Sequence, residues 1–413
     1  MKICVYRGTN EVGGNCIELS TKNTRILLDM GMPLSSMDEK RPITDYKVPC
    51  PGIYADETPS VDAIFITHNH GDHYGLLPLI NPKIPVYMSK MLRDILVTAQ
   101  PLVTDDFDVS QLNIQEIGAN KSVQIGDFTV TARPVDHAPD SYGFEITDGI
   151  KTVVYTGDIR FHSGQSWKSK ALAKTCKNPD YLIMEGTRMS RAETQEEYPT
   201  EDSVYLGIQK IIRGSKKIAF VDASTQSVDR FCSIIKACIA SGRNLVISPY
   251  AAHLLDIYHN LHKTVPDYKA DCIWVYHGVA KPQYPKFKQA GLMDKYIDKK
   301  IDVDTILKNP EKYVIFHCPK LYRSLVDTHK LDYDFIYSMW YGYLDRKHTW
   351  DKYAEHLIKI HTSGHADIES LKKFVQVMNP TKIIPIHTEC KNDFENVFGI
   401  STLVLNDNEK VEL

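Results

Sequence analysis

The segment ITHNHGDHYG, residues 66–75, concentrates side chains that could bind a metal ion. His68, His70, Asp72 and His73 fall within six positions and form the pattern HxHxDH. Three imidazoles and a carboxylate in so short a stretch would be costly to bury without a partner. Imidazole and carboxylate ligands suit zinc, and iron or manganese are alternatives. The segment therefore predicts a metal site.

Five more residues of ligand type come at the ends of short β-type runs. They are His137 after TVTARPVD, Asp158 after TVVYTG, Glu185 at the end of YLIME, His365 after LIKIHTSG and His387 after KIIPI. Taken singly, such a histidine is more often a core residue, and such an aspartate a turn or cap residue. Because strand ends at one edge of a sheet converge, however, these side chains could meet beside HxHxDH. Gly71 is expected to let the chain turn there, and YGLLPLI, residues 74–80, to begin a helix.

The elements that must position these residues fall into two patterns. Short β-type runs dominate the first 190 residues and predict a packed pair of sheets. From about residue 200, strands such as KIAFVDA and NLVISP alternate with helical runs, which is typical of a parallel α/β unit. After a helix near WDKYAEHL the ligand-bearing β pattern returns. We therefore expect one domain made of residues 1–195 and 351–413, interrupted by a second domain at 196–350.

Composition restricts the class of protein. A chain of 413 residues, 43% apolar and 24% charged, is long enough for two globular domains. The net charge of -3 gives no global footprint for nucleic acid, although a local groove stays open. Nine cysteines without a CxxC pair favour reduced thiols in the cytoplasm. The sequence has no apolar leader and no 18-residue apolar span, which argues against secretion and membrane insertion.

The chain resembles a known family. HxHxDH with His137, Asp158 and, after RILL, Asp29 is similar to the metallo-β-lactamase superfamily. Glu185 in LIMEGT, His365 in HTSGHA and His387 in PIHTE resemble motifs A, B and C of its β-CASP nucleases, and GTNEVGGNCIEL and VDHAPDSYGFEI resemble ribonuclease J. The resemblance implies an α/β protein, a metallo-β-lactamase αββα sandwich with an inserted β-CASP α/β domain. Because the sequence ends at Leu413, it implies a compact form lacking the C-terminal domain of ribonuclease J.

The resemblance also implies a site with two zinc ions, for which manganese or iron are alternatives. One ion would be held by His68, His70 and His137, the other by Asp72, His73 and His387, and Asp158 would bridge them. A hydroxide between the ions would be the nucleophile. Asp29 would orient a ligand. His365 would be the leaving-group acid and a phosphate contact, oriented by Glu185, so that the implied catalytic residues are Asp72, Glu185 and His365.

The implied substrate is RNA, because a histidine at motif C resembles the RNA-processing branch. Ser363 and Gly364 could contact a phosphate beside His365. Ser224 and Thr225 in DASTQSVDR could do so at a helix N-terminus, although a plain helix cap is the favoured interpretation. The aromatic stretch YSMWYGY, residues 337–343, could stack bases or pack a core. For the lysines between 281 and 300 a solvated face is favoured over a phosphate track.

Three functions are compatible with the sequence. The leading one is a zinc-dependent phosphodiester hydrolase, a ribonuclease cutting from an end, internally or both. The second is a metallo-hydrolase of small esters or thioesters, which would share HxHxDH, with a DNA nuclease of the same fold as a further alternative. The third is a scaffold whose site has decayed. The oligomeric state stays open, a homodimer included.

Overall fold

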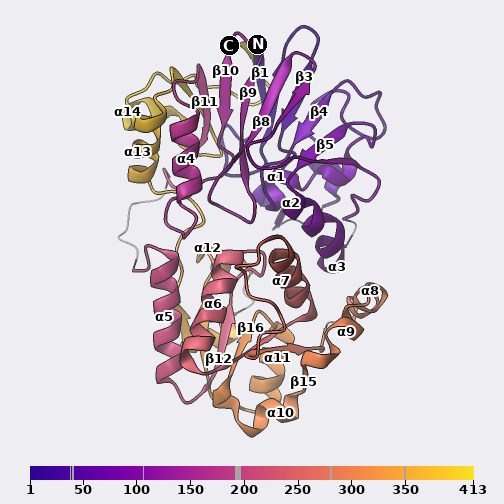
Figure 1. The fold of residues 1–413 in the computed structure, drawn as a ribbon, viewed down its shortest axis with the longest axis vertical. Coiled ribbons are helices and arrows are strands. Elements are labelled where there is room, and N and C mark those ends of the chain that lie inside the picture. The colour runs from indigo at the N-terminus through magenta and orange to yellow at the C-terminus, as the bar shows by residue number, and fades with distance from the viewer. Residues whose placement is uncertain (38, 40, 106, 191–196, 280, 348–349) are drawn as a thin grey trace. The chain divides into compact units, whose positions relative to one another are not determined.

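The chain forms two compact units in a computed structural model that describes residues 1–37, 39, 41–105, 107–190, 197–279, 281–347 and 350–413 (Figure 1). The first unit comprises Met1–Val97, Phe107–Thr194 and Gly364–Leu413, and the second comprises Thr98–Asp106 and Gln195–Ser363. The second unit continues past the expected boundary at 350, because β18 (Leu357–Lys359) pairs in parallel with β17 (Tyr333–Tyr337). The run before His365 therefore belongs to the second unit's sheet.

Two mixed sheets build the first unit. The strand order in one is β20-β1-β2-β3-β4-β5-β6, with bounds Lys410–Glu412, Lys2–Arg7, Cys16–Ser20, Arg25–Leu28, Ala63–Phe65, Pro85–Met88 and Asn113–Glu116. The order in the other is β19-β11-β10-β9-β8-β7, with bounds Lys382–Ile386, Tyr181–Glu185, Thr152–Tyr155, Tyr142–Thr147, Phe128–Pro134 and Ser122–Ile125. The predicted pair of packed sheets is confirmed.

Helices cover the outer faces of both sheets, which gives the αββα order of layers. Alternate residues of β4 show this: Ala63 and Phe65 enter the core between the sheets, whereas Ile64 faces the layer of α1 (Gly71–Tyr74) and α2 (Lys90–Asp94). In β11, Leu182 and Met184 face the layer of α4 (Trp167–Thr175), α13 (Ile368–Met378) and α14 (Phe394–Phe398). Strands buried on both faces read as continuous apolar runs such as AIF and YLIM.

The second unit is built on a parallel sheet, as its alternating pattern predicts. Its order is β15-β14-β13-β16-β12-β17-β18, in which β15, β14, β13, β16 and β12 are Lys300–Ile301, Ile273–Tyr276, Asn244–Ile247, Tyr313–Phe316 and Ile218–Asp222. The helices are α3 (Gln100–Val103), α5 (Glu201–Gly214), α6 (Val228–Ser241), α7 (Pro249–Leu261), α8 (Tyr284–Gln289), α9 (Leu292–Lys295), α10 (Val303–Lys308), α11 (Pro319–Arg323) and α12 (Gly342–Lys347).

Three local expectations differ from the structure. The run YGLLPLI is not one helix, because α1 ends at Tyr74 and a separate 3-10 turn spans Leu77–Leu79. The helix expected near WDKYAEHL is a 3-10 turn at Asp351–His356. Gly71 lies inside α1, and a Cβ added there would meet no atom within 4 Å, so the turn does not need a glycine at that position.

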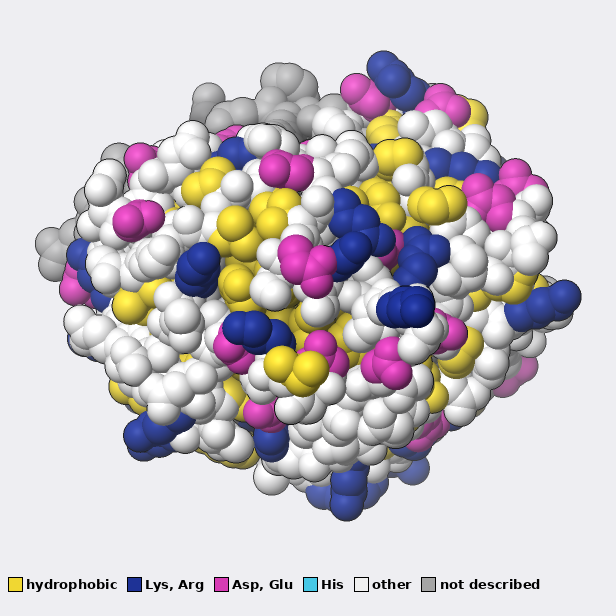
Figure 2. All heavy atoms as spheres, turned by 90° about the horizontal axis from the view of Figure 1, so that it is seen from above, with side chains coloured by type: hydrophobic (Ala, Val, Ile, Leu, Met, Phe, Trp, Pro, Cys, Tyr) yellow, Lys and Arg dark blue, Asp and Glu magenta, His cyan; other side chains and the backbone are white. Residues whose placement is uncertain are grey.

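Charge is dispersed over the face of the molecule that Figure 2 shows. On the face drawn in Figure 2, lysine and arginine side chains are interspersed with acidic ones, in keeping with the net charge of -3. Among the described residues, no helix combines the length and apolar character that crossing a bilayer requires.

Candidate metal centre

The expected ligands lie just beyond the carboxyl ends of strands in the first unit. His68 follows β4, and Asp72 and His73 lie in α1 directly after it. His137, Asp158 and His387 follow β8, β10 and β19. The strands β10, β11 and β19 are parallel, and β8 runs the same way because β9 is antiparallel to both β8 and β10. Their carboxyl ends therefore share one edge, where all seven expected ligands meet.

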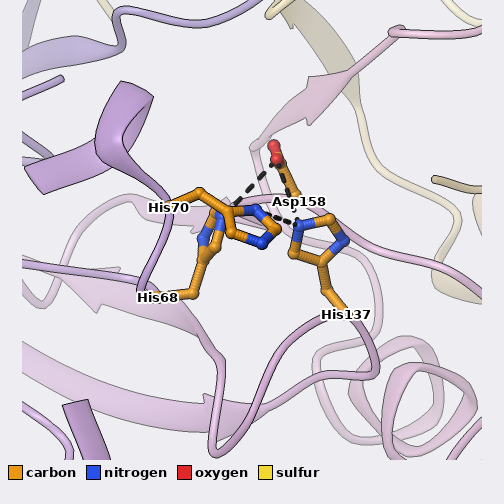
Figure 3. A group of neighbouring side chains, drawn as sticks. All are labelled: His68, His70, His137 and Asp158. Carbon is orange, nitrogen blue, oxygen red and sulfur yellow. Dashed lines mark hydrogen bonds and ion pairs between the residues drawn. The ribbon is translucent and has the colours of Figure 1, made fainter. Parts of the chain in front are cut away.

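One group of ligands is formed by His68, His70, His137 and Asp158, whose side chains point toward one another (Figure 3). His70 Nδ1 lies 3.1 Å from His68 Nε2 and 3.0 Å from His137 Nε2. Asp158 Oδ2 lies 3.6 Å from His68 Nε2 and 3.4 Å from His137 Nε2. Three ring nitrogens and one carboxylate oxygen thus converge on one point, as a tetrahedral metal site requires.

A second group lies on the other side of Asp158. It consists of Asp72, His73 and His387. His387 Nε2 lies 3.3 Å from Asp72 Oδ2 and 3.7 Å from Asp158 Oδ1. His73 Nε2 lies 3.2 Å from Asp158 Oδ2. The Asp158 carboxylate therefore faces both groups, one oxygen toward His387 and the other toward His68, His73 and His137.

The protonation of the first group suits a cation. Burial lowers the pKa of His68 and His137 well below the ordinary value, and it lowers that of His70 to about 4. The unprotonated imidazole that results is the form that binds a metal. Burial also lowers the pKa of His73, but the carboxylates of Asp158, Asp29 and Asp72 outweigh burial and raise it. This excess of buried negative charge favours a cation.

An unsatisfied atom tests the fit of a metal ion. Asp158 is 2% exposed, and its Oδ1 is buried without a hydrogen-bond partner among the described residues. Buried carboxylate oxygens are rarely left in this state, because the loss of hydration is costly. A bound divalent cation would satisfy this oxygen, so the residues present fit the metal that the sequence predicts.

Glu185 and His365 form a pair beside both groups. The His365 ring lies with Nδ1 2.9 Å from Glu185 Oε2, and the side chain is 19% exposed. Glu185 Oε1 accepts the backbone N–H of Ile159 at 2.7 Å, and Oε2 also accepts the Thr187 hydroxyl. Both residues lie within a third cluster with Asp158 and His387. Because three donors already engage Glu185, we assign it to orienting His365 and not to metal binding.

Further residues anchor the ligand rings from behind. Asp29 Oδ2 lies 2.8 Å from His73 Nδ1, which supports the role expected for this aspartate, and it accepts the Tyr155 hydroxyl at 2.7 Å. His137 Nδ1 lies 2.7 Å from the Gly364 carbonyl oxygen. Gly364, expected to contact a phosphate, thus uses its carbonyl group to hold a ligand ring. Such outer hydrogen bonds fix the ring orientation of metal ligands.

Sequence reasoning missed Thr67 and Thr187, which are 2% and 1% exposed. Each hydroxyl contacts a carboxylate and a ligand histidine. The only signal in the sequence was their place beside His68 and Glu185, and threonine at a strand end is too common to be singled out.

The other candidates for substrate contact, Ser224 and Ser363, belong to the second unit. Ser224 is exposed, and its hydroxyl accepts the backbone N–H of Gln226 at 3.3 Å. The N-cap of α6 is Ser227, whose side chain makes no capping hydrogen bond. The favoured capping role for Ser224 is therefore wrong, and its role as a phosphate contact stays a prediction.

The aromatic and lysine-rich stretches have structural partners. Tyr337 is buried in the core of the second unit, and Tyr341 packs against that core. Lys286 donates to Asp105 at 2.7 Å, and Lys295 pairs with Asp256 at 2.6 Å. These contacts favour core packing for the first stretch and a solvated face for the second.

Comparison with known proteins agrees with this geometry. Residues 24–218 match the beta-lactamase superfamily domain, and residues 352–396 match the Zn-dependent metallo-hydrolase RNA specificity domain. Ribonuclease J of Mycobacterium tuberculosis is 25% identical over 59% of the chain and 44% of its own length. Transcription termination factor FttA of Methanothermobacter thermautotrophicus is 26% identical over 65% and 44%. The chain thus spans less than half the length of these relatives.

Two further matches extend over nearly the whole chain. Ribonuclease J of Mycoplasma pneumoniae is 22% identical over 94% of the chain and 68% of its own length. A crystal structure of a protein of unknown function from Enterococcus faecalis is 19% identical, covers 100% of the chain and 99% of its own, and gives a TM-score of 0.79, which shows a common fold. The matched domains and relatives together support a ribonuclease J-like β-CASP protein with a metallo-β-lactamase domain.

Proposed function

We propose that this protein is a metal-dependent phosphodiester hydrolase that acts on RNA. The observation that carries the proposal is the convergence of two ligand groups on Asp158, with the His365–Glu185 pair beside them. A decayed scaffold would have lost some of these side chains. A hydrolase of small esters needs the metal ligands but has no evident use for an additional oriented imidazole.

The residues that would hold the metal follow from the two groups. We assign His68, His70 and His137 to one ion and Asp72, His73 and His387 to a second, with Asp158 shared, and we propose zinc because nitrogen ligands dominate. When bound, such a pair of ions activates water and stabilises charge on the phosphodiester oxygens. Manganese and iron remain alternatives for the same ligands.

The proposed role of His365 is to donate a proton. Its Nδ1 faces Glu185, so the hydrogen bond to that carboxylate fixes the orientation of the ring. A nearby carboxylate also stabilises the imidazolium that must give up a proton. His365 would donate from Nε2 to the oxygen of the departing nucleotide, and Glu185 would hold the ring in place throughout.

RNA is the proposed substrate because the C-terminal match is to an RNA specificity domain and because several relatives are ribonucleases. We keep Ser363 and Ser224 as proposed phosphate contacts, and we propose that the second unit is the inserted β-CASP domain. All nine cysteines are free, which fits the expected cytoplasmic location. The proposal does not depend on an oligomeric state.

The test uses 3′-labelled, 5′-monophosphorylated single-stranded RNA. The protein is loaded with zinc or manganese, its metal content is measured, and it is compared with a His365→Ala variant of equal metal content. Cleavage by the wild type alone supports the proposal, and a ladder or a mononucleotide product gives the polarity. Metal-loaded protein that leaves RNA intact but cleaves DNA or a thioester would overturn it in favour of that substrate.

A further inference from the structure

Two buried threonines each lie between a carboxylate and a candidate metal ligand. The Thr67 hydroxyl is 3.0 Å from Asp29 Oδ2 and 2.9 Å from His68 Nδ1. The Thr187 hydroxyl donates to Glu185 Oε2 and is 2.8 Å from His387 Nδ1. The two threonines come from different places, one after β4 and the other after β11. The same arrangement thus occurs twice in one site.

The number of protons that each group can donate determines the direction of each hydrogen bond. A threonine hydroxyl has one proton to donate, and a carboxylate oxygen can only accept. The proton of Thr67 therefore goes to Asp29, and that of Thr187 goes to Glu185. Each threonine oxygen is left as an acceptor, so the ring nitrogen that faces it must carry a hydrogen. His68 and His387 are thereby held with hydrogen on Nδ1.

This assignment leaves Nε2 of both rings with a free lone pair. His68 Nε2 lies 3.6 Å from Asp158 Oδ2, and His387 Nε2 lies 3.3 Å from Asp72 Oδ2. Both nitrogens thus face the other ligands of their group. If either ring took the other tautomer, Nε2 would present a hydrogen to the metal position and the ligand would be lost.

We propose that Thr67 and Thr187 are positioning residues that select the metal-binding tautomer of His68 and His387. The proposal rests on the metal site proposed above and adds residues to it. The Thr67 hydroxyl also lies 3.4 Å from Nδ1 of His73, but the nearer partner of that nitrogen is Asp29 Oδ2 at 2.8 Å. Because His68 belongs to one ligand group and His387 to the other, each hydroxyl would orient a ligand of a different group. Thr187 has a second effect, since its proton goes to the same Glu185 oxygen that faces His365. It therefore links a metal ligand to the proposed proton donor.

The test replaces each hydroxyl by a methyl group of similar size. The variants are Thr67→Val and Thr187→Val, with Thr67→Ser and Thr187→Ser to restore the hydroxyl. Thr388→Val is the matched control, because Thr388 is 0% exposed and its hydroxyl donates to the Gly186 carbonyl at 3.1 Å without contacting a ligand. Circular dichroism and urea unfolding establish that each variant folds.

The readout is zinc affinity and stoichiometry, measured by competition with a coloured chelator. We expect each valine variant to lose about 10–100-fold in affinity for one of two zinc equivalents and to keep the other. The double valine variant should lose affinity for both. The serine variants should stay within a few-fold of the wild type, and Thr388→Val should match it.

The outcomes separate this inference from the proposed function. Wild-type protein that binds no zinc would remove the metal site itself. Wild-type protein that binds two equivalents, together with folded valine variants of unchanged affinity, would overturn only the role of the threonines. A folded serine variant as weak as its valine counterpart would also overturn it, because packing and not the hydroxyl would then matter.

Discussion

The hydrogen-bond donors around each buried carboxylate distinguish a candidate metal ligand from a positioning residue. Glu185 is the clearest case, because it is 1% exposed and receives three donors, from Ile159, Thr187 and His365. A carboxylate can accept all three at once, and no cation is then needed to satisfy it. Asp158 is the opposite case, since its Oδ1 has no hydrogen-bond partner among the described residues. The number of hydrogen-bond donors around each carboxylate thus distinguishes Glu185 from Asp158.

Replacing Glu185 by glutamine tests this distinction. The amide NH2 would face at least one of the three donors, so the ring of His365 should lose its orientation. We expect the rate of RNA cleavage to fall about 10²–10⁴-fold, the range that a general acid contributes, while zinc content stays at the wild-type value. Asp158→Asn serves as the comparison, because it should lower zinc content itself. Loss of zinc from the Glu185→Gln variant would show instead that Glu185 is a ligand.

The site residues that could be predicted from the sequence are those marked by a local pattern. HxHxDH is dense enough to be recognised, and His137, Asp158 and His387 were found because each follows a strand. Thr67 and Thr187 carry no such signal, because their role depends on partners at residues 29, 185 and 387 that only the fold brings near. The sequence thus predicts the ligands better than the side chains that orient them.

At the scale of elements, the ligand loop after β4 is positioned by a neighbouring loop and not by its own glycine. A Cβ on Gly31 would lie 1.8 Å from the backbone oxygen of Asp72, whereas one on Gly71 would meet nothing within 4 Å. The Asp72 carbonyl also accepts the backbone N–H of Asn15 at 3.1 Å. The loops on either side of β2 and β3 therefore hold the segment that carries Asp72.

Alanine substitutions should distinguish the two glycines. Gly31→Ala should push Asp72 out of place, destabilise the fold by about 1–3 kcal/mol as overpacking does, and lower zinc affinity. Gly71→Ala should be neutral or stabilise by up to about 1 kcal/mol, because it lies in a helix and restricts the unfolded chain. Urea unfolding and zinc titration of both variants provide the measurement. Equal effects of the two substitutions would contradict this account of the loop.

Glu18 joins four strands of the first sheet. It lies on β2, is 0% exposed, and accepts Tyr6 of β1, Arg25 of β3 and Lys410 of β20 at 2.8, 2.7 and 2.8 Å. Burial alone would raise its pKa, but the hydrogen bonds from Arg25, Lys410 and Tyr6 outweigh burial and lower the pKa to about 2. The carboxylate is thus more stable in the folded chain than in the unfolded one.

The sign of the resulting pH dependence follows from this lowering. The unfolded carboxyl group takes up a proton below a pH of about 4.3, whereas the folded one stays charged to about pH 2. Stability from Glu18 is therefore full above about pH 5 and is lost as the pH falls toward 2, by up to about 3 kcal/mol. Urea unfolding of wild type and Glu18→Gln at pH 6 and pH 3 measures it. The variant should show a smaller loss between the two; parallel losses would contradict the assignment.

Strands were predicted from the sequence where a local run of apolar residues marks them. They were missed where their place depends on pairing with a strand far away in the sequence. The strands β4, β10, β11 and β12 read as apolar runs because both of their faces are buried. The strand β18 has only three residues, and its place beside β17 depends on pairing that no local pattern reveals. For the same reason no local pattern indicates that Thr98–Asp106 belongs to the second unit, where Lys286 donates to the Thr104 and Pro101 carbonyl groups.

In the molecule as a whole, the candidate metal centre belongs to one of the two units. The seven candidate ligands, Glu185 and His365 all belong to the first unit, although they are drawn from three stretches of chain. The second unit has a buried ion pair of its own, in which Arg230 donates to both oxygens of Glu201 at 3.0 and 2.9 Å. The stability of each unit can therefore be changed separately, through metal binding in the first unit and through the ion pair in the second.

Metal removal and a change in that ion pair should act on different unfolding transitions. Under the proposed ligand assignment zinc binds only the folded first unit, so at 1,000 times its dissociation constant it should stabilise that unit by about 4 kcal/mol, and chelation should lower one transition. Glu201→Gln weakens a buried pair whose complete disruption costs about 3–5 kcal/mol, so it should lower the other transition and leave zinc content unchanged. Calorimetry of wild type and variant, each with and without chelator, gives the four curves needed. Equal lowering of both transitions by the chelator would contradict this prediction, and so would loss of zinc from the Glu201→Gln variant. Either result would show that the two units unfold together as one cooperative unit.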